Sequence, residues 1–223
     1  MNRRRLILSG LAFSALAAAL IVPPTVKAGP PLTCHPFNIG NAKSLPWSSQ
    51  LWNLEGKPDY DVSRLVQDTL ALLTPDTPII VRMETLRRAA LYSKRDPGIA
   101  RDLVGKLEAR ASDSDGKGNP DALAWFDLGY LAETIKQANM TWRKLASGGW
   151  EPVLNPSAAT GVDGYAYVLK AIKLRGEDAD MEFAAALVTM YPRQQKLCDE
   201  HLRKAKLGAR GGTLLAKSLI TNW

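Results

Sequence analysis

Cysteine and histidine are nearly missing from this chain: its 223 residues contain two of each. These residue types supply most metal ligands and activated nucleophiles, so their scarcity argues against most metal-dependent and nucleophilic enzymes. No Ser–His–Asp order stands out, because His35 and His201 are the only histidines that could act as the base. A glycine-rich phosphate loop is also missing, since residues 208–212 follow an expected helix and lack the required lysine and serine spacing.

Residues that favour sheet are scarce as well. Valine and isoleucine are sparse beside alanine and leucine, and no long run alternates apolar and polar residues with a period of two. Alanine and leucine favour helix. We therefore predict an all-α fold with about eight helices.

The first 28 residues have the pattern of a cleavable export signal. Three arginines precede an apolar run over residues 6–22, and residues 26–28 (Val-Lys-Ala) offer small side chains to a signal peptidase. We expect cleavage before Gly29 and a periplasmic or secreted protein with no integral membrane segment after cleavage. The alternative is an uncleaved anchor, because the apolar run approaches the lower limit of a spanning helix. Residues 3–7 also resemble a twin-arginine leader.

A strong basic excess is absent once that leader is removed. Loss of Arg3, Arg4, Arg5 and Lys27 lowers the formal net charge from +7 to +3. This balance is ordinary for a soluble domain, and we expect no nucleic-acid partner. Basic residues still gather between positions 193 and 217. We interpret them as a solvated helix face, with contact to an anionic lipid or a cell-wall polymer as the alternative.

An irregular arm follows the leader over residues 29–58. It is rich in Pro, Gly, Asn and Ser and shows neither a helical nor a strand period. It nevertheless contains Phe37, Trp47 and Trp52, whose large apolar surfaces favour burial. We expect the arm to insert these anchors into a single helical domain over residues 59–223. The alternative is an exposed recognition arm in which the same side chains bind a partner.

Helix starts are marked by a capping side chain directly before a proline at three places: Thr77-Pro78, Asp96-Pro97 and Asn119-Pro120. The segments that follow carry apolar residues at helical spacing, for example Ile99, Leu103 and Leu107. The same period predicts further helices over residues 62–73, 162–174, 179–189, 193–207 and 213–219.

Two stretches resemble tetratricopeptide repeats. Trp125-x-x-Leu128-Gly129 matches the opening of that repeat's first helix. Residues 171–179 are similar to the junction between two repeats, with Gly176 where the family usually has proline. The resemblance implies a stack of antiparallel α-hairpins in which each helix pair buries its apolar stripe against its neighbours. It carries over no functional residues.

The two cysteine–histidine pairs allow two interpretations. In the oxidising compartment of an exported protein, two cysteines usually form a disulfide, so we predict a bond between Cys34 and Cys198 that also holds the arm. The alternative is a zinc site of Cys34, His35, Cys198 and His201, because Cys-x-x-His on a helix places both side chains on one face. Residues 113–121 alternate like a calcium loop but lack the bidentate glutamate, and we interpret them as a solvated turn. We expect no cofactor.

The export signal, the paired helices and the lack of a catalytic set favour one function. We expect a non-enzymatic helical-repeat protein that binds a protein or peptide partner in the bacterial envelope. The alternative is an all-α envelope hydrolase of polysaccharides, which needs two carboxylates facing each other across a cleft at roughly 5 to 10 Å. The sequence singles out no such pair among its 22 acidic residues.

Overall fold

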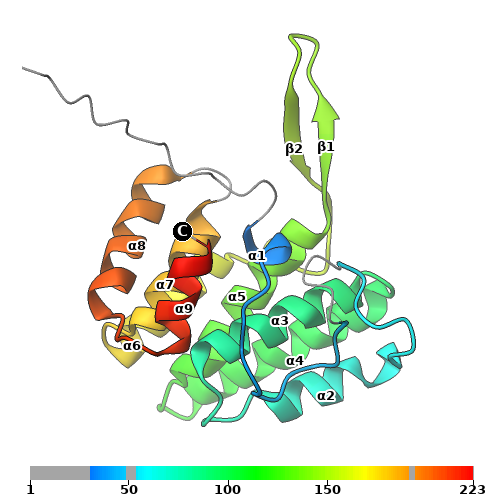
Figure 1. Cartoon of the computed structure of the whole chain (residues 1–223). Helices are drawn as coiled ribbons and strands as arrows, with labels where there is room; N and C mark the ends of the chain where they lie inside the picture. The colour runs from blue at the N-terminus through cyan, green and yellow to red at the C-terminus, as the bar shows by residue number, and fades with distance from the viewer. Residues whose placement is uncertain (1–30, 49–53, 191–193, 223) are drawn as a thin grey trace, which may run out of the picture.

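The computed structural model describes residues 31–48, 54–190 and 194–222 (Figure 1). The leader, the expected cleavage site before Gly29 and the side chain of Trp52 lie outside the described residues. The described part of the chain is mostly helical, which confirms the all-α class. In chain order its elements are α1 (Pro31–Cys34), the 3-10 turn η1 (Val62–Arg64), α2 (Leu65–Leu72), α3 (Ile79–Ser93), α4 (Pro97–Gly116), α5 (Ala122–Ala138), β1 (Met140–Lys144), β2 (Trp150–Leu154), α6 (Gly164–Arg175), α7 (Ala179–Met190), α8 (Gln195–Gly208) and α9 (Leu214–Asn222).

The helices begin close to the predicted starts, but only one of the three predicted caps is used. Asp96 caps α4, because its carboxylate accepts hydrogen bonds from two backbone N–H groups of the first turn. The prediction for Thr77 is wrong: its hydroxyl donates to the carbonyl of Leu72 at 2.7 Å and does not cap α3. The prediction for Asn119 is also wrong, since α5 is capped by Asp121.

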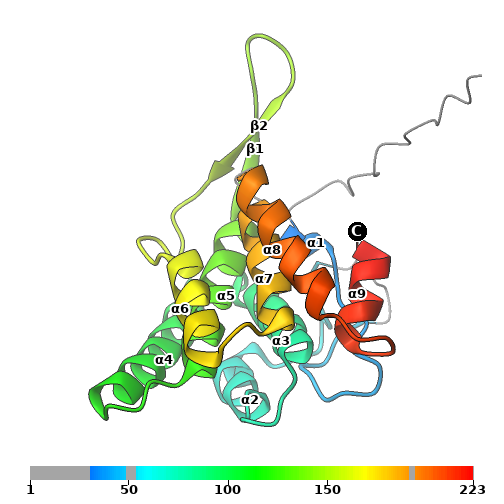
Figure 2. The ribbon, with the colours of Figure 1, turned by 90° about the vertical axis from the view of Figure 1, so that its left-hand side faces the viewer.

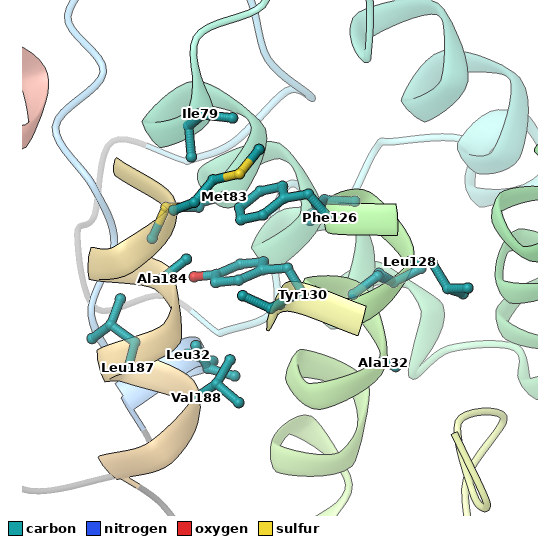
Figure 3. Packing of buried hydrophobic residues seen from close by; sticks show 14 of the residues in the cluster. Leu32, Ile79, Met83, Phe126, Leu128, Tyr130, Ala132, Ala184, Leu187 and Val188 are labelled. Atoms are coloured by element: carbon teal, nitrogen blue, oxygen red, sulfur yellow. The ribbon is translucent and has the colours of Figure 1, made fainter. Parts of the chain in front are cut away.

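Helix α5 lies at the centre of the helical body and packs against α3, α4 and α6, while α7 packs against α8. Figure 3 shows Met83 of α3, Phe126 and Tyr130 of α5, and Leu187 and Val188 of α7 meeting in one core. All five side chains are buried. Burying an apolar side chain of this size contributes roughly 1.5–3 kcal/mol, so this layer is a main source of the body's stability.

Helices α5 and α6 approach each other closely at two glycines. A Cβ atom added at Gly129 would lie 2.6 Å from the carbonyl oxygen of Gly164 and 3.0 Å from the Cβ of Tyr167. A Cβ added at Gly164 would lie closer still to the carbonyl oxygen of Gly129. Only glycine at both positions permits this approach of the two backbones. Gly129, which belongs to the motif that resembles a tetratricopeptide repeat, is therefore a packing residue.

The arm is fastened to α3 by polar side chains. Glu84 is buried and accepts a hydrogen bond from the backbone N–H of Phe37 at 3.1 Å. Arg87 and Arg88 both donate to Glu84, and each also donates to a carbonyl group of the arm, at 2.9 and 2.6 Å. The hydroxyl of Tyr92 donates to another arm carbonyl at 2.6 Å. The arm begins with the one-turn helix α1, which was not predicted, and is irregular after it, so these contacts supply partners to a backbone that has no ladder of its own.

The structure does not contain the disulfide predicted between Cys34 and Cys198, and both residues are free thiols. Cys198 is buried on the inner face of α8, and this burial, together with the charge of Asp199, raises the pKa of its thiol to about 11. The prediction assumed that the arm needs a covalent attachment. Glu84 and its two arginines provide that attachment without a covalent bond.

The aromatic side chains of the arm face inward. Phe37 is buried and lies edge-on to Phe183 of α7, with ring centroids 6.1 Å apart. Trp47 is half-buried, packs on Tyr92 at 5.2 Å, and has the Arg87 guanidinium 5.1 Å from its ring centroid. Both residues are anchors of the arm, so neither is presented to a partner as a recognition arm requires.

Candidate functional site

A β-hairpin extends from the end of α5. Strands β1 and β2 pair antiparallel, and the hairpin stands clear of the helices in both views (Figures 1 and 2). We did not predict this element from the sequence, because we expected only helices in this part of the chain. Most of its residues are exposed, so the hairpin contributes little to the core of the helical body.

The local sequence accounts for the turn and for the pairing. The N–H of Gly148 donates to the carbonyl of Leu145, and the N–H of Leu145 donates to the carbonyl of Gly149, both at 3.1 Å. Gly148 has a φ of +85°, the left-handed conformation that a three-residue hairpin loop requires at this position. Further down the strands, Arg143 Nε donates to Glu151 Oε1 at 2.6 Å across the pair.

One face of the hairpin is apolar and exposed. Residues two apart on a strand share a face, and so do directly opposite residues on paired strands. The register therefore places Trp142, Trp150 and Leu154 on the same face, which we call the tryptophan face. Their exposed fractions are 47%, 63% and 51%. The opposite face carries the ion pair of Arg143 and Glu151. Large apolar side chains gathered on an exposed face mark an interaction site.

A polar cluster in the interior joins α6, α7 and α8. His201 Nδ1 lies 2.5 Å from Glu182 Oε2, and His201 Nε2 lies 2.8 Å from the hydroxyl of Tyr165. Glu182 also lies 3.5 Å from the Lys204 ammonium. Burial, with the charges of Glu200 and Glu182, raises the pKa of Tyr165, so the phenol stays protonated and is a poor nucleophile. The cluster is a polar bridge between three helices.

The four residues considered for zinc do not form a ligand set. No group of three or more His, Cys, Asp or Glu side chains in residues 31–48, 54–190 and 194–222 is arranged to hold a metal ion. Both ring nitrogens of His201 already have partners in the polar bridge. The Cys198 thiol stays protonated because of its burial. His35 is buried in the arm next to Cys34, and the structure does not bring these two to a shared site with the other pair.

An open hollow of about 600 Å³ lies at the C-terminal end of α4 and contains the carboxylates of Asp113 and Asp121. Asp121 has a structural role there, because it caps α5 and lies 3.8 Å from Arg110. Small-molecule sites are mostly apolar and enclose their ligand, whereas this hollow is polar and open. The hollow therefore does not have the enclosed, apolar lining of a small-molecule site.

The structure thus leads to residues that our sequence reasoning passed over. The sequence candidates were Phe37, Trp47, Trp52 and the cysteine–histidine pairs, but among the described residues the exposed aromatic side chains are Trp142 and Trp150. A signal was available, because a glycine-containing loop between two short runs rich in aromatic and β-branched residues is typical of a hairpin. The runs were too short for their alternation to stand out against the helices on either side.

Comparison with protein-family models, with curated proteins and with solved structures found no match for this chain. None of the helices in the described part of the chain has both the length and the hydrophobicity that crossing a bilayer requires.

Proposed function

We propose that this chain is an exported, non-enzymatic helical protein that binds a protein partner in the bacterial envelope through the tryptophan face of its hairpin. The observation that carries the proposal is the exposure of Trp142, Trp150 and Leu154 on one face of an element that projects from the helical body. The compartment follows from the export signal of the sequence. Stacking of the tetratricopeptide type belongs to the same proposal, supported by the packing of α5 on α6 and of α7 on α8.

The helical body does not need these tryptophans. Trp142 and Trp150 are exposed and are not part of the buried core, so their apolar surface stabilises little within the chain. Tryptophan is among the residues most often found at the energetic centre of protein interfaces, because a partner can bury so much apolar area on one side chain. Binding is the role that uses this exposed surface.

A protein fits the hairpin better than a lipid bilayer does. A two-stranded hairpin leaves backbone N–H and C=O groups unpaired along its outer edges, and such groups do not enter hydrocarbon without partners. The same short ribbon also carries the charges of Arg143, Lys144 and Glu151. A protein surface can offer both apolar contacts and hydrogen-bond partners.

Co-purification with a matched control tests the proposal. Truncating one hot-spot tryptophan costs about 2 kcal/mol, which is roughly 30-fold in Kd. The double variant Trp142→Ser with Trp150→Ser should therefore lose its envelope partner at least about tenfold in quantitative mass spectrometry of the purified complex. Leu207→Ser is the control, because Leu207 is an exposed apolar residue, 75% exposed, on α8.

Both variants should keep the wild-type melting temperature, because they change exposed side chains only. Equal recovery of the same partner by the wild type and by the double tryptophan variant would contradict the proposal. Loss of the partner in the Leu207→Ser variant alone would move the contact surface from the hairpin to α8.

A further inference from the structure

We propose that the partner contributes an extended strand that pairs with the free edge of β1 and places an acidic side chain opposite Lys144. This inference rests on the proposed function and specifies how the hairpin binds. The register of the two strands, the position of Pro152 and the charge on the tryptophan face carry it.

The register fixes which backbone groups point away from the hairpin. In an antiparallel pair, residues that exchange two hydrogen bonds with their partner alternate with residues whose N–H and C=O groups point outward. Trp142 lies opposite Pro152, which has no N–H, so this pair is of the outward kind. The N–H of Leu145 bonds to the carbonyl of Gly149, so Leu145 belongs to the hydrogen-bonded pairs, and the alternation again makes Lys144 and Trp142 the outward-pointing residues. Lys144, two residues after Trp142, therefore also directs its backbone groups outward.

The two edges of the hairpin are not equivalent. The edge of β1 offers the backbone donors and acceptors of Trp142 and Lys144 in an unbroken row. The edge of β2 lacks a donor at Pro152, and proline is typical of edges that do not accept another strand. Figures 1 and 2 show the hairpin clear of the helices. Strand addition, a common mode of peptide recognition, is therefore favoured at β1.

The charges define the chemistry of the added strand. Lys144 shares the tryptophan face, is exposed, and forms no ion pair within the described residues, whereas Arg143 on the other face is paired with Glu151. Directly opposite side chains on neighbouring strands stabilise a sheet when their charges are opposite or when both are apolar. The complementary strand carries an apolar residue opposite Trp142 and an aspartate or glutamate opposite Lys144.

A second copy of this chain fits the edge less well. If two β1 strands paired antiparallel about Trp142, Met140 of each copy would lie opposite Lys144 of the other. The lysine would then have no countercharge, and a register shifted toward the turn would place the two lysines opposite each other. A protein strand with an acidic residue satisfies both the edge and the charge.

Amide hydrogen exchange on the complex recovered from the envelope tests the strand pairing. Pairing at β1 should slow exchange of the Trp142 and Lys144 N–H groups by at least about tenfold, because both become hydrogen-bonded. The N–H groups of Trp150 and Leu154, on the edge of β2, should exchange as in the free chain. Unchanged exchange at β1, or equal slowing at both edges, would overturn the inference.

A pair of variants at one position separates the backbone contribution from the charge. Lys144→Ala removes the charge and keeps the N–H, while Lys144→Pro removes both. Recovery of the partner should fall several-fold with alanine and about tenfold further with proline, because the partner's carbonyl acceptor is then left without its hydrogen bond. The Lys144 N–H points outward, so the hairpin itself should survive, which the near-ultraviolet circular dichroism of Trp142 and Trp150 reports.

The outcomes distinguish this inference from the proposed function. If the double tryptophan variant loses the partner but Lys144→Pro and Lys144→Ala behave alike, the function stands and the strand pairing is overturned. If none of these variants loses the partner, both fall. The purified chain is also tested for binding to phosphatidylglycerol vesicles and for dimerisation in sedimentation. If either occurs and the double tryptophan variant abolishes it, the tryptophan face binds a membrane or a second copy, and the inference is overturned.

Discussion

Substituting alanine for Gly129 tests the close contact between α5 and α6 against the ordinary effect of glycine in a helix. The matched control is Gly105 within α4, where an added Cβ meets nothing within 4 Å. Replacing glycine by alanine in a helix interior contributes about 0.5–1 kcal/mol of stability. At Gly105 this is the whole expected effect, so Gly105→Ala should stabilise the protein.

At Gly129 the same gain is opposed by a steric overlap. The added Cβ would lie 2.6 Å from the carbonyl oxygen of Gly164, whereas ordinary contacts begin at 3.4 Å. A backbone oxygen cannot rotate away as a flexible side chain can, so α6 has to move away from α5. Overpacking of this kind typically costs 1–3 kcal/mol and occasionally more. Because the overlap is with a backbone atom, we take a cost of about 3 kcal/mol, which after the helix gain of up to about 1 kcal/mol lowers the free energy of unfolding of Gly129→Ala by about 2 kcal/mol.

Thermal unfolding followed by circular dichroism at 222 nm measures both variants. For a domain of this size, 1 kcal/mol shifts the melting temperature by about 2–4 °C. Gly105→Ala should raise the melting temperature by about 1–4 °C, and Gly129→Ala should lower it by about 4–8 °C. A Gly129→Ala variant as stable as the wild type, or shifts of the same sign at both positions, would refute the packing of α5 on α6 described above.

Three further predictions concern the buried polar groups. Burial outweighs the Arg82 ion pair and raises the pKa of Asp127 to about 6. The free energy of unfolding should therefore fall by about 2 kcal/mol as the pH rises from 4 to 7, because the folded state holds this proton to higher pH than the unfolded state does. Urea unfolding of Asp127→Asn should lack that slope, and parallel profiles for the variant and the wild type would contradict the prediction. Cys34 should react with iodoacetamide in the native protein, while Cys198, buried and protonated, should react only after unfolding. Peptide mapping measures the labelling of each cysteine, and equal labelling rates would contradict the prediction. Glu84→Ala leaves buried arginine charge without a counterion and should lower the free energy of unfolding by about 3–5 kcal/mol. Trypsin should then cleave the arm faster than in the wild type. An unchanged cleavage rate would contradict the attachment of the arm through Glu84.

Most of the helices could be predicted from the sequence because their signals are local. The apolar period and the Asp96 cap depend on residues within one or two turns of each other. The hairpin was missed because each strand is only five residues long and β1 begins directly after the strongly periodic helix α5. Its Gly148 marked a turn, but the sequence did not show that strands flank it.

The buried charges of α3 could not be predicted for a different reason. Arg82, Glu84 and Arg87 carry charges, and charged side chains are almost never fully buried unless they are paired, yet all three are buried. The arm, more than 30 residues earlier in the chain, donates a hydrogen bond to Glu84 and accepts one from Arg87, and Asp127 of α5 pairs with Arg82. Contacts between residues so far apart leave no local pattern. The polar bridge at His201 was missed for the same reason, because Glu182 and Tyr165 lie on two other helices.

Site-specific photocrosslinking in living cells tests the proposed function most directly. A benzoylphenylalanine in place of Trp150 or Trp142 samples the tryptophan face, while the same group in place of Val153 samples the opposite face on β2, away from the edge of β1, and in place of Leu207 samples α8. We predict that the two tryptophan positions give an adduct with the same envelope protein and that the other two do not. Adducts of equal yield from all four positions, or from Leu207 alone, would contradict the assignment of the hairpin as the binding element.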